Sequence, residues 1–189
     1  MINMTTLPLP KERNLFFIKQ FDQASVGELT KSIIDINGND EYLIKLYDLH
    51  GLNYIPKPIR IHIDSFGGVL IPCLGLISVI EKSKTPIHTI CVGGGISCGF
   101  LTLIVGHRRF AYKYSTPMCH QLSGGSVGKM TDMEESVEQS KKIQKLIEKI
   151  ILEKTKITKK KLKEIREKKF DWYMTSTEAL KLGVIDEII

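Results

Sequence analysis

The sequence predicts a single α/β domain over residues 1–189, with crossover connections between parallel strands. A chain of 189 residues is long enough to bury a sizeable core. A strand at 59–64 leads through a glycine turn into an apolar helix at 69–83, and the same order returns with a strand at 87–93 and a helix at 97–105. Two successive units of strand, glycine turn and buried helix are typical of an α/β fold.

A short strand and a helix are predicted ahead of these units. The segment 14–19 (NLFFIK) has the apolar character of a strand. Ser25 and Glu28 have capping-box spacing, which predicts that a helix begins at Ser25. Residues 37–58 mix turn residues with an apolar YLIKLY segment and end near two prolines, so we expect them to lead into extended chain.

Two further strands and a long helix follow. Short strands are expected at 109–113 and 118–122. Thr131 and Glu134 form a second capping box, which predicts an amphipathic helix that ends near Lys154. Its apolar stripe consists of Met133, Val137, Ile143, Leu146, Ile147, Ile150 and Ile151.

The last part of the chain predicts two more helices. One begins at Thr158 and has only Leu162 and Ile165 to bury. A short helix at 176–182 follows, which Gly183 ends.

Positive charge is concentrated in one segment. The chain carries 27 Lys and Arg against 21 Asp and Glu, a net charge of +6. Thirteen of the basic residues but only four of the acidic ones lie between Lys141 and Lys169, so the rest of the chain is net negative. A general nucleic-acid-binding surface is therefore not indicated. We interpret these basic residues as the solvated outer face of amphipathic helices. The alternative is a docking surface for an acidic partner.

The composition also argues against membrane, secreted and metal-binding classes. No apolar run approaches the roughly 20 residues that a membrane-spanning helix needs. The N-terminal residues carry two prolines and mixed charges where a signal peptide needs a basic start and an apolar stretch. The four cysteines form no CxxC pair, so neither disulfides nor zinc are indicated. We therefore expect a cytoplasmic protein with free thiols and without metal or cofactor.

Residues 95–99 (GISCG) form a G-x-S-x-G motif between a predicted strand and a predicted helix. A tight glycine turn at this position exposes the oxygen of Ser97, and the N-terminus of the following helix directs free N–H groups at a developing oxyanion. The alternative reading is a glycine-rich turn in which Ser97 only caps the helix.

The order of the histidines decides which partner Ser97 could have. In an α/β-hydrolase the triad histidine lies near the end of the chain, whereas no histidine follows His120 here, so the triad of that fold is excluded. His62 and His88 alternate within strands, and His107 lies in a basic turn. His120 is therefore the best candidate base.

Three acids could orient that histidine. Asp132 lies in the first turn of a helix, where the helix dipole explains it, and Asp186 lies in the last strand. Asp171 begins an apolar return to the domain, although pairing with Lys168 or Lys169 would explain it as well.

A glycine turn supplies the remaining part of a catalytic site. Gly67 and Gly68 follow the strand at 59–64 and allow a substrate backbone to approach closely. The N–H of Gly68 could then point to the same place as the N–H of Cys98 and form an oxyanion hole.

These pieces, in this order, resemble the proteolytic subunits of Clp protease, which are serine peptidases. The match rests on the Gly-Gly turn, TICVGGGISCG, MCHQLSGG and DWYMTSTEALKLGVIDEI. The resemblance implies a ClpP/crotonase-like fold, a repeated β-β-α spiral with a protruding handle of a strand plus a long helix at about 121–155. It implies Ser97 as nucleophile, His120 as base and Asp171 as orienting acid, with oxyanion donors at Gly68 and Cys98. It assigns substrate binding to Gly67, Leu122, Ser123, Gly124 and Gly125.

The resemblance also implies partners. Peptides or unfolded proteins would be the substrates, the assembly would be stacked heptameric rings of identical chains, and an ATP-dependent unfoldase would be a partner. The host would be a bacterial or phage-infected cell or an organelle of bacterial origin. Three departures stand out: the pore loop of the family is not recognisable, Phe66 stands where a proline is usual, and Leu122 replaces the proline after His-Gln.

Two alternatives remain beside a serine endopeptidase. A catalytically impaired ring subunit is one, because Gly94, Gly95 and Ile96 replace the usual residues before the serine. A crotonase-like acyl-CoA enzyme shares the fold and uses paired backbone N–H groups, but it would leave the serine, histidine and acid as a coincidence. Since the basic segment overlaps the handle, pairing of rings is expected to depend on salt.

Overall fold

A mostly parallel sheet of seven strands forms the centre of the protein in a computed structural model that describes residues 10–189. The tail on which the signal-peptide argument depends lies largely outside the described residues. The strands are β1 (Asn14–Phe17), β2 (Ile59–Ser65), β3 (Ile87–Ile96), β4 (Arg108–Ala111), β5 (Thr116–Cys119), β6 (Trp172–Tyr173) and β7 (Glu187–Ile188). The helices are α1 (Gln23–Leu49), α2 (Leu70–Lys82), α3 (Cys98–Ile104), α4 (Met130–Lys154), α5 (Lys159–Lys168) and α6 (Ser176–Lys181).

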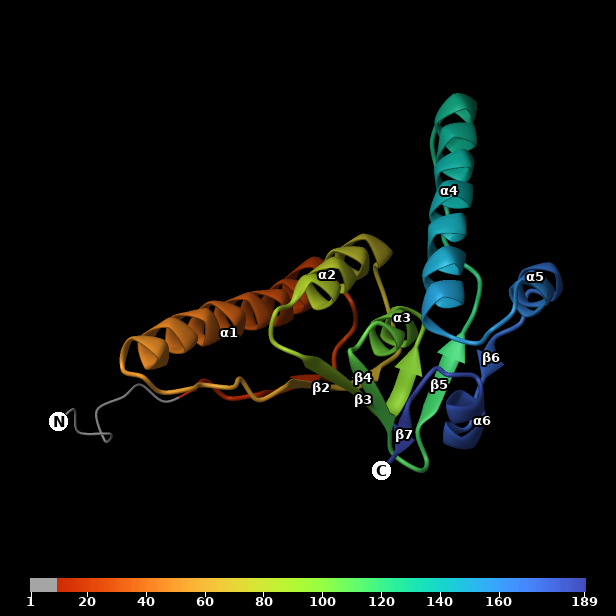
Figure 1. Ribbon diagram of the computed structural model, residues 1–189. Coiled ribbons are helices and arrows are strands. Elements are labelled where there is room, and N and C mark those ends of the chain that lie inside the picture. Colours follow the sequence, from red (N-terminus) through yellow and green to blue (C-terminus); the bar gives the residue numbers. More distant parts are fainter. Residues whose placement is uncertain (1–9) are drawn as a thin grey trace.

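The sheet has two branches that share β3. One runs in the order β1-β2-β3-β4-β7, and in the other β5 pairs with β3 and with β6. All pairs are parallel except β5 with β6. α1 and α2 pack together above one end of the sheet, and α3 lies against β3 (Figure 1). Ile61, Ile63 and Leu76 are completely buried between these layers. The predicted α/β fold is thus confirmed.

The first helix is longer than the sequence indicated. α1 begins after Asp22, whose side chain accepts the N–H of Ser25, so Ser25 is the third helical residue and not the cap. The helix then continues to Leu49, through the first part of the segment whose turn residues and prolines led us to expect an exit into extended chain. Those polar residues have partners outside the helix, since Asn37 accepts the N–H groups of Lys84 and Thr85. Tertiary contacts therefore outweigh the local turn signal.

A buried ion pair holds the N-terminal segment against α1. Asp40 is 2% exposed and binds the guanidinium of Arg13 at 2.5 and 2.7 Å, while Thr85 and Tyr54 donate to the same carboxylate. Burial alone would raise the pKa of Asp40, but these hydrogen bonds outweigh it and lower the pKa. Asp40 therefore remains charged while it joins four segments of the chain.

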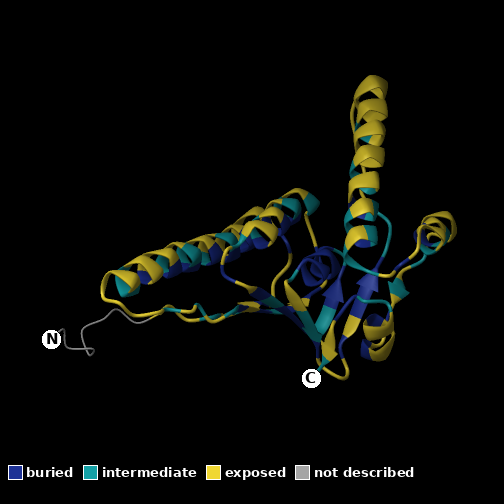
Figure 2. Cartoon of the chain, viewed as in Figure 1, coloured by how far each residue is buried: buried dark blue, intermediate teal, exposed yellow. Residues whose placement is uncertain are grey.

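α4 protrudes from the body of the protein, as the predicted handle does (Figure 1). It ends at Lys154 as expected, but it begins after Lys129 without a side-chain cap, so the capping box of Thr131 and Glu134 is wrong. Only Ile147 and Ile151 of its predicted stripe are buried. Its N-terminal part is exposed, and Val137 is 52% exposed (Figure 2). A single chain thus leaves three of the seven stripe residues, Met133, Val137 and Leu146, exposed to solvent.

The strands near the motif also differ from the prediction. β3 continues through the three glycines to Ile96, because Gly94 and Gly95 pair with β5, so the glycines form strand and not a turn. β5 ends at Cys119, and the segment 120–128 has no strand pairing within the described part of the chain. The glycine-rich strand expected there thus lacks an intramolecular partner.

The C-terminal helices agree with the prediction. α5 is capped by Thr158 and buries Leu162 and Ile165. α6 ends before Gly183, which adopts φ +64°. Among the helices of residues 10–189, none is both long and apolar enough to cross a bilayer.

Candidate active site

Ser97 occupies a sharp turn between β3 and α3. Its backbone has φ 57° and ψ −114°, a region that L-residues rarely adopt. Such strain persists only where the surroundings enforce it and is common at functional sites. The side chain of Ser97 makes no capping hydrogen bond to α3, so the reading as a plain helix cap is wrong. The turn instead presents its hydroxyl at the end of the strand.

Pairing of β5 with β3 brings His120 to that hydroxyl. Ile96 is in register with Met118, and the N–H of Ser97 donates to the carbonyl of Met118 at 3.1 Å. His120 comes just after β5, and its Nε2 lies 2.8 Å from Ser97 Oγ. This is the distance at which an imidazole can take a proton from a serine hydroxyl.

The antiparallel pair of β5 and β6 places Asp171 on the other side of the imidazole. Cys119 is opposite Trp172, so the residues that flank this pair, His120 and Asp171, are neighbours. Asp171 Oδ1 lies 3.7 Å from His120 Nδ1, and its side chain is 57% exposed. That distance is longer than a hydrogen bond, so the carboxylate faces the imidazole but does not hydrogen-bond to it.

The other acids and histidines considered as orienting acid or as base have different surroundings. Asp186 accepts three hydrogen bonds from Arg109. Asp132 lies in the first turn of α4. Lys168, which was an alternative partner for Asp171, binds Glu164 at 2.9 Å instead. Of the other histidines, His62 stacks on Phe16, His88 lies against Phe110, and His107 accepts the N–H of Ile87.

The Gly67-Gly68 turn lies directly against Ser97. A Cβ on Gly67 would lie 2.7 Å from Cβ of Ser97, and Gly67 has φ +93°. Gly68 has φ +145°, and a Cβ there would collide with the backbone carbonyl of Phe21. Only glycine fits either position.

Two N–H groups at this turn are available for a ligand. Phe21 N–H donates to the carbonyl of Gly67, and Val69 N–H donates to that of Phe21, a pattern that passes over Gly68 N–H. Cys98 is the first residue of α3, where a helix has no acceptor for its N–H. The Sγ of Cys98 lies 3.5 Å from the carbonyl of Gly68, so the two residues adjoin. Phe21, which sequence reasoning missed, thus fixes the turn.

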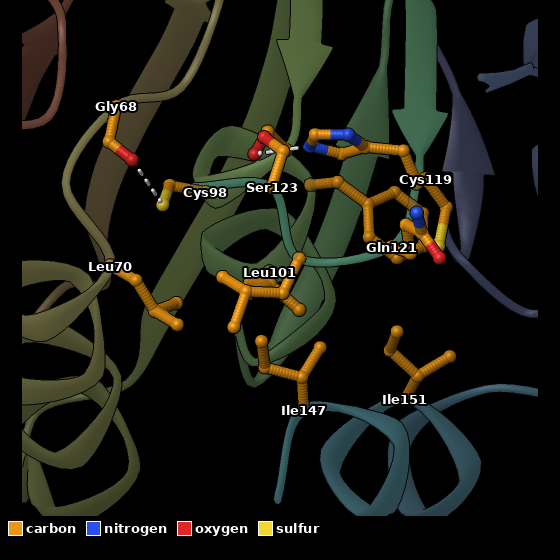
Figure 3. A pocket seen from close by; sticks show the side chains of 13 residues that line it. Gly68, Leu70, Cys98, Leu101, Cys119, Gln121, Ser123, Ile147 and Ile151 are labelled. Atoms are coloured by element: carbon orange, nitrogen blue, oxygen red, sulfur yellow. Dashed lines mark hydrogen bonds between the residues drawn. The ribbon is translucent and has the colours of Figure 1, made fainter. Parts of the chain in front are cut away.

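A cavity of about 60 Å³ opens beside Ser97. Apolar side chains from three helices form much of its wall, with Leu70 from α2, Leu101 from α3, and Ile147 and Ile151 from α4 (Figure 3). Leu122 and Ser123 also line it, whereas Gly124 and Gly125 do not. Of the predicted substrate-binding residues, the structure thus brings Leu122 and Ser123 to the cavity.

The thiols near the site are buried. All four cysteines are free. Burial raises the pKa of Cys119 to about 12 and that of Cys91 to about 12. The neighbouring thiol of Cys73, which lies 3.5 Å from the carbonyl of Cys98, lowers the pKa of Cys98, yet Cys98 is only 2% exposed and points toward Gly68. A thiol nucleophile is therefore not favoured.

Two polar side chains near the site have anchoring roles that the sequence did not indicate. Asp64 accepts the N–H of Gly94 at 2.8 Å and so anchors the glycine-rich end of β3. Gln144 of α4 accepts the N–H of Leu122 at 2.7 Å. Its spacing from Ile147 and Ile151, which places it on the same face of the helix, was the only available signal.

Comparison with known proteins agrees with this arrangement. The family model described as Clp protease matches residues 9–189. The ATP-dependent Clp protease proteolytic subunit 2 of Bacillus licheniformis is 30% identical over 183 residues, which cover 96% of this chain and 88% of the relative. The parallel sheet with its protruding helix is consistent with the ClpP/crotonase-like fold. The chain therefore belongs to the Clp protease family.

Proposed function

We propose that this peptidase is a serine endopeptidase in which Ser97 is the nucleophile and His120 the general base. The observation that carries the proposal is the 2.8 Å contact between His120 Nε2 and Ser97 Oγ at a strained turn. His120 takes the hydroxyl proton as Ser97 attacks the peptide carbonyl, and it returns that proton to the leaving amine. Water then hydrolyses the acyl-enzyme by the same route.

The backbone N–H groups of Gly68 and Cys98 bind the oxyanion of the tetrahedral intermediate in this proposal. Both are fixed by main-chain geometry, so they need no reorganisation during the reaction. Asp171 stabilises the imidazolium when it forms. The apolar cavity beside Ser97 accepts an apolar side chain of the substrate.

We also propose that residues 1–189 form one domain, with a handle at about 121–155, and that the chain works in stacked heptameric rings. The exposed apolar residues of α4 support an assembly, because a single chain leaves Met130 and Val137 in solvent. The name of the relative describes it as ATP-dependent. For this chain the corresponding partner would be an ATP-dependent unfoldase that delivers unfolded protein.

A fluorophosphonate probe tests the nucleophile, and native mass measurement in the same sample tests the assembly. We expect covalent labelling and cleavage of small fluorogenic peptides, both lost in Ser97→Ala while the assembled mass is unchanged. Labelling that survives Ser97→Ala would refute the assignment. Assembled rings that neither label nor cleave would favour an impaired ring subunit, and turnover of acyl-CoA without peptide cleavage would favour a crotonase-like enzyme.

A further inference from the structure

The segment that follows His120 is tied to α4 through one side chain. Residues 120–128 belong to no strand or helix, so no ladder supplies acceptors for their backbone N–H groups. The N–H of Leu122 donates instead to Oε1 of Gln144 at 2.7 Å. Leu122 and His120 both line the cavity, together with Ile147 and Ile151 of the same helix. The bond thus joins the helix to the wall of the site.

Two further contacts fix the orientation of the Gln144 amide. Its Nε2 donates to Oε1 of Glu148 at 3.0 Å, and the same oxygen accepts from Arg166 of α5 at 2.6 Å. Since a carboxylate only accepts, it selects the NH₂ end of the amide and leaves Oε1 facing Leu122. The Glu148 side chain is 20% exposed, so this charge-assisted contact is partly shielded from water.

We propose that Gln144 is a positioning residue for the peptidase site, oriented by Glu148 and Arg166. It holds the backbone two residues after His120 and so fixes the approach of the imidazole to Ser97 and the position of Leu122 at the cavity. This inference rests on the proposed function. It also gives α5 a route to the site, because a shift of Arg166 would be passed through Glu148 and Gln144 to Leu122.

The first test compares Gln144→Ala with Gln139→Ala, an exposed glutamine on the same helix. Loss of one hydrogen bond in the former corresponds to about a fivefold decrease in kcat/KM. The rate of Ser97 labelling by a fluorophosphonate should fall by the same factor, while the assembled mass does not change. Gln139→Ala should match the wild type. Equal rates in the two variants would overturn the proposal.

A charge exchange separates positioning from simple loss of packing. In Gln144→Glu the new carboxylate can still accept the N–H of Leu122, but it faces the charge of Glu148, so activity should fall. Adding Glu148→Gln restores a donor opposite that carboxylate, and kcat/KM should return to within about twofold of the wild type. A double variant no better than the single one would contradict the assigned roles.

Removal of the N–H itself gives a third test. Proline has no N–H, so in a Leu122→Pro background Gln144→Ala should cause no further decrease. An undiminished fivefold loss would show that Gln144 acts elsewhere. If Leu122→Pro does not fold, the charge exchange decides alone.

Amide hydrogen exchange makes the result independent of peptidase activity. In a Ser97→Ala background, Gln144→Ala should speed exchange at the Leu122 amide about fivefold, whereas Gln139→Ala should not. Faster exchange would support the contact between Gln144 and Leu122 even if the wild-type chain cleaved no peptide, and that combination of results would refute only the proposed function. Unchanged exchange would refute the inference whatever the activity.

Discussion

The two sides of the candidate site differ in how firmly one chain holds them. On one side Ser97 lies in a strained turn between buried elements, against a glycine that admits no Cβ, and His120 is 2.8 Å away. On the other side Asp171 is 57% exposed and 3.7 Å from the imidazole, and the adjoining segment 120–128 has no regular structure. The core therefore positions the proposed nucleophile and base, whereas the proposed acid lies at the surface.

This difference indicates where a neighbouring chain would matter. An exposed ion pair contributes little because water screens it. The two helices near this side also have exposed side chains, since Met130 and Val137 of α4 and Lys159 and Lys163 of α5 lie in solvent (Figure 2 shows both helices largely exposed). A partner that covers them would exclude water from the acid side and leave the nucleophile side unchanged.

The largest expected effect comes from the firmly held side. His120→Ala should lower kcat on the order of 10⁶-fold, because removal of the base disables the nucleophile as well. Peptide cleavage at constant protein concentration measures this, with His88→Ala as a matched histidine control. A loss of less than about 10³-fold would show that His120 is not the base.

The glycine turn should give the second largest effect. Gly68→Ala would force a Cβ into the Phe21 carbonyl and displace the N–H, so we expect kcat to fall about 10²- to 10³-fold, as for loss of one oxyanion donor. Gly38→Ala, inside α1 with no atom within 4 Å of its Cβ, is the control. Equal kinetics for the two variants would show that the turn plays no part in catalysis.

Asp171 should matter less than the acid of a buried triad. Asp171→Asn is expected to lower kcat on the order of 10²-fold, short of the about 10⁴-fold found where the acid is fully engaged. Single-turnover acylation of the assembled protein is the measurement. A loss of about 10⁴-fold would mean that assembly closes the 3.7 Å gap and that Asp171 is then held as firmly as Ser97 and His120.

The smallest effect concerns salt. Raising the ionic strength from about 0.1 M to about 1 M shortens the screening length from about 10 to about 3 Å. The charges between Lys141 and Lys169 then act over a shorter range, so the assembled mass should change and peptidase activity should change a few-fold. Ser97→Ala, measured in parallel, should change mass in the same way. A constant mass from low to high salt would exclude a role of the basic segment in ring pairing.

Much of the firmly held side could be predicted from sequence. The motif at 95–99 and the absence of histidines after His120 depend only on residue order, and the structure brings Ser97 and His120 together. The strands at 59–64 and 87–93 were found because apolar residues follow the period of the element. Local sequence patterns were thus sufficient to predict the elements and residues whose positions are set by the buried core.

The rest depends on contacts between distant residues. The turn signal at residues 37–49 failed because Asn37 and Asp40 bind the chain at Thr85 and Arg13. The clamp of Phe21 on Gly68 joins positions that no local pattern links. The apolar stripe of α4 was correctly placed on a helix, but its periodicity could not reveal that only Ile147 and Ile151 are covered by the same chain.

The clamp of Phe21 on the glycine turn has a consequence for synthesis. The proposed site needs the backbone of Phe21 at one end of the sequence and Asp171 at the other, with Ser97 and His120 between them. A nascent chain that has reached only the middle of the sequence can form the nucleophile turn without the base or the acid. In the proposed mechanism, hydrolytic capacity therefore arises late, when nearly the whole chain has left the ribosome and folded. Under the proposed function, this chain would therefore be unable to cleave peptides while its own synthesis is still in progress.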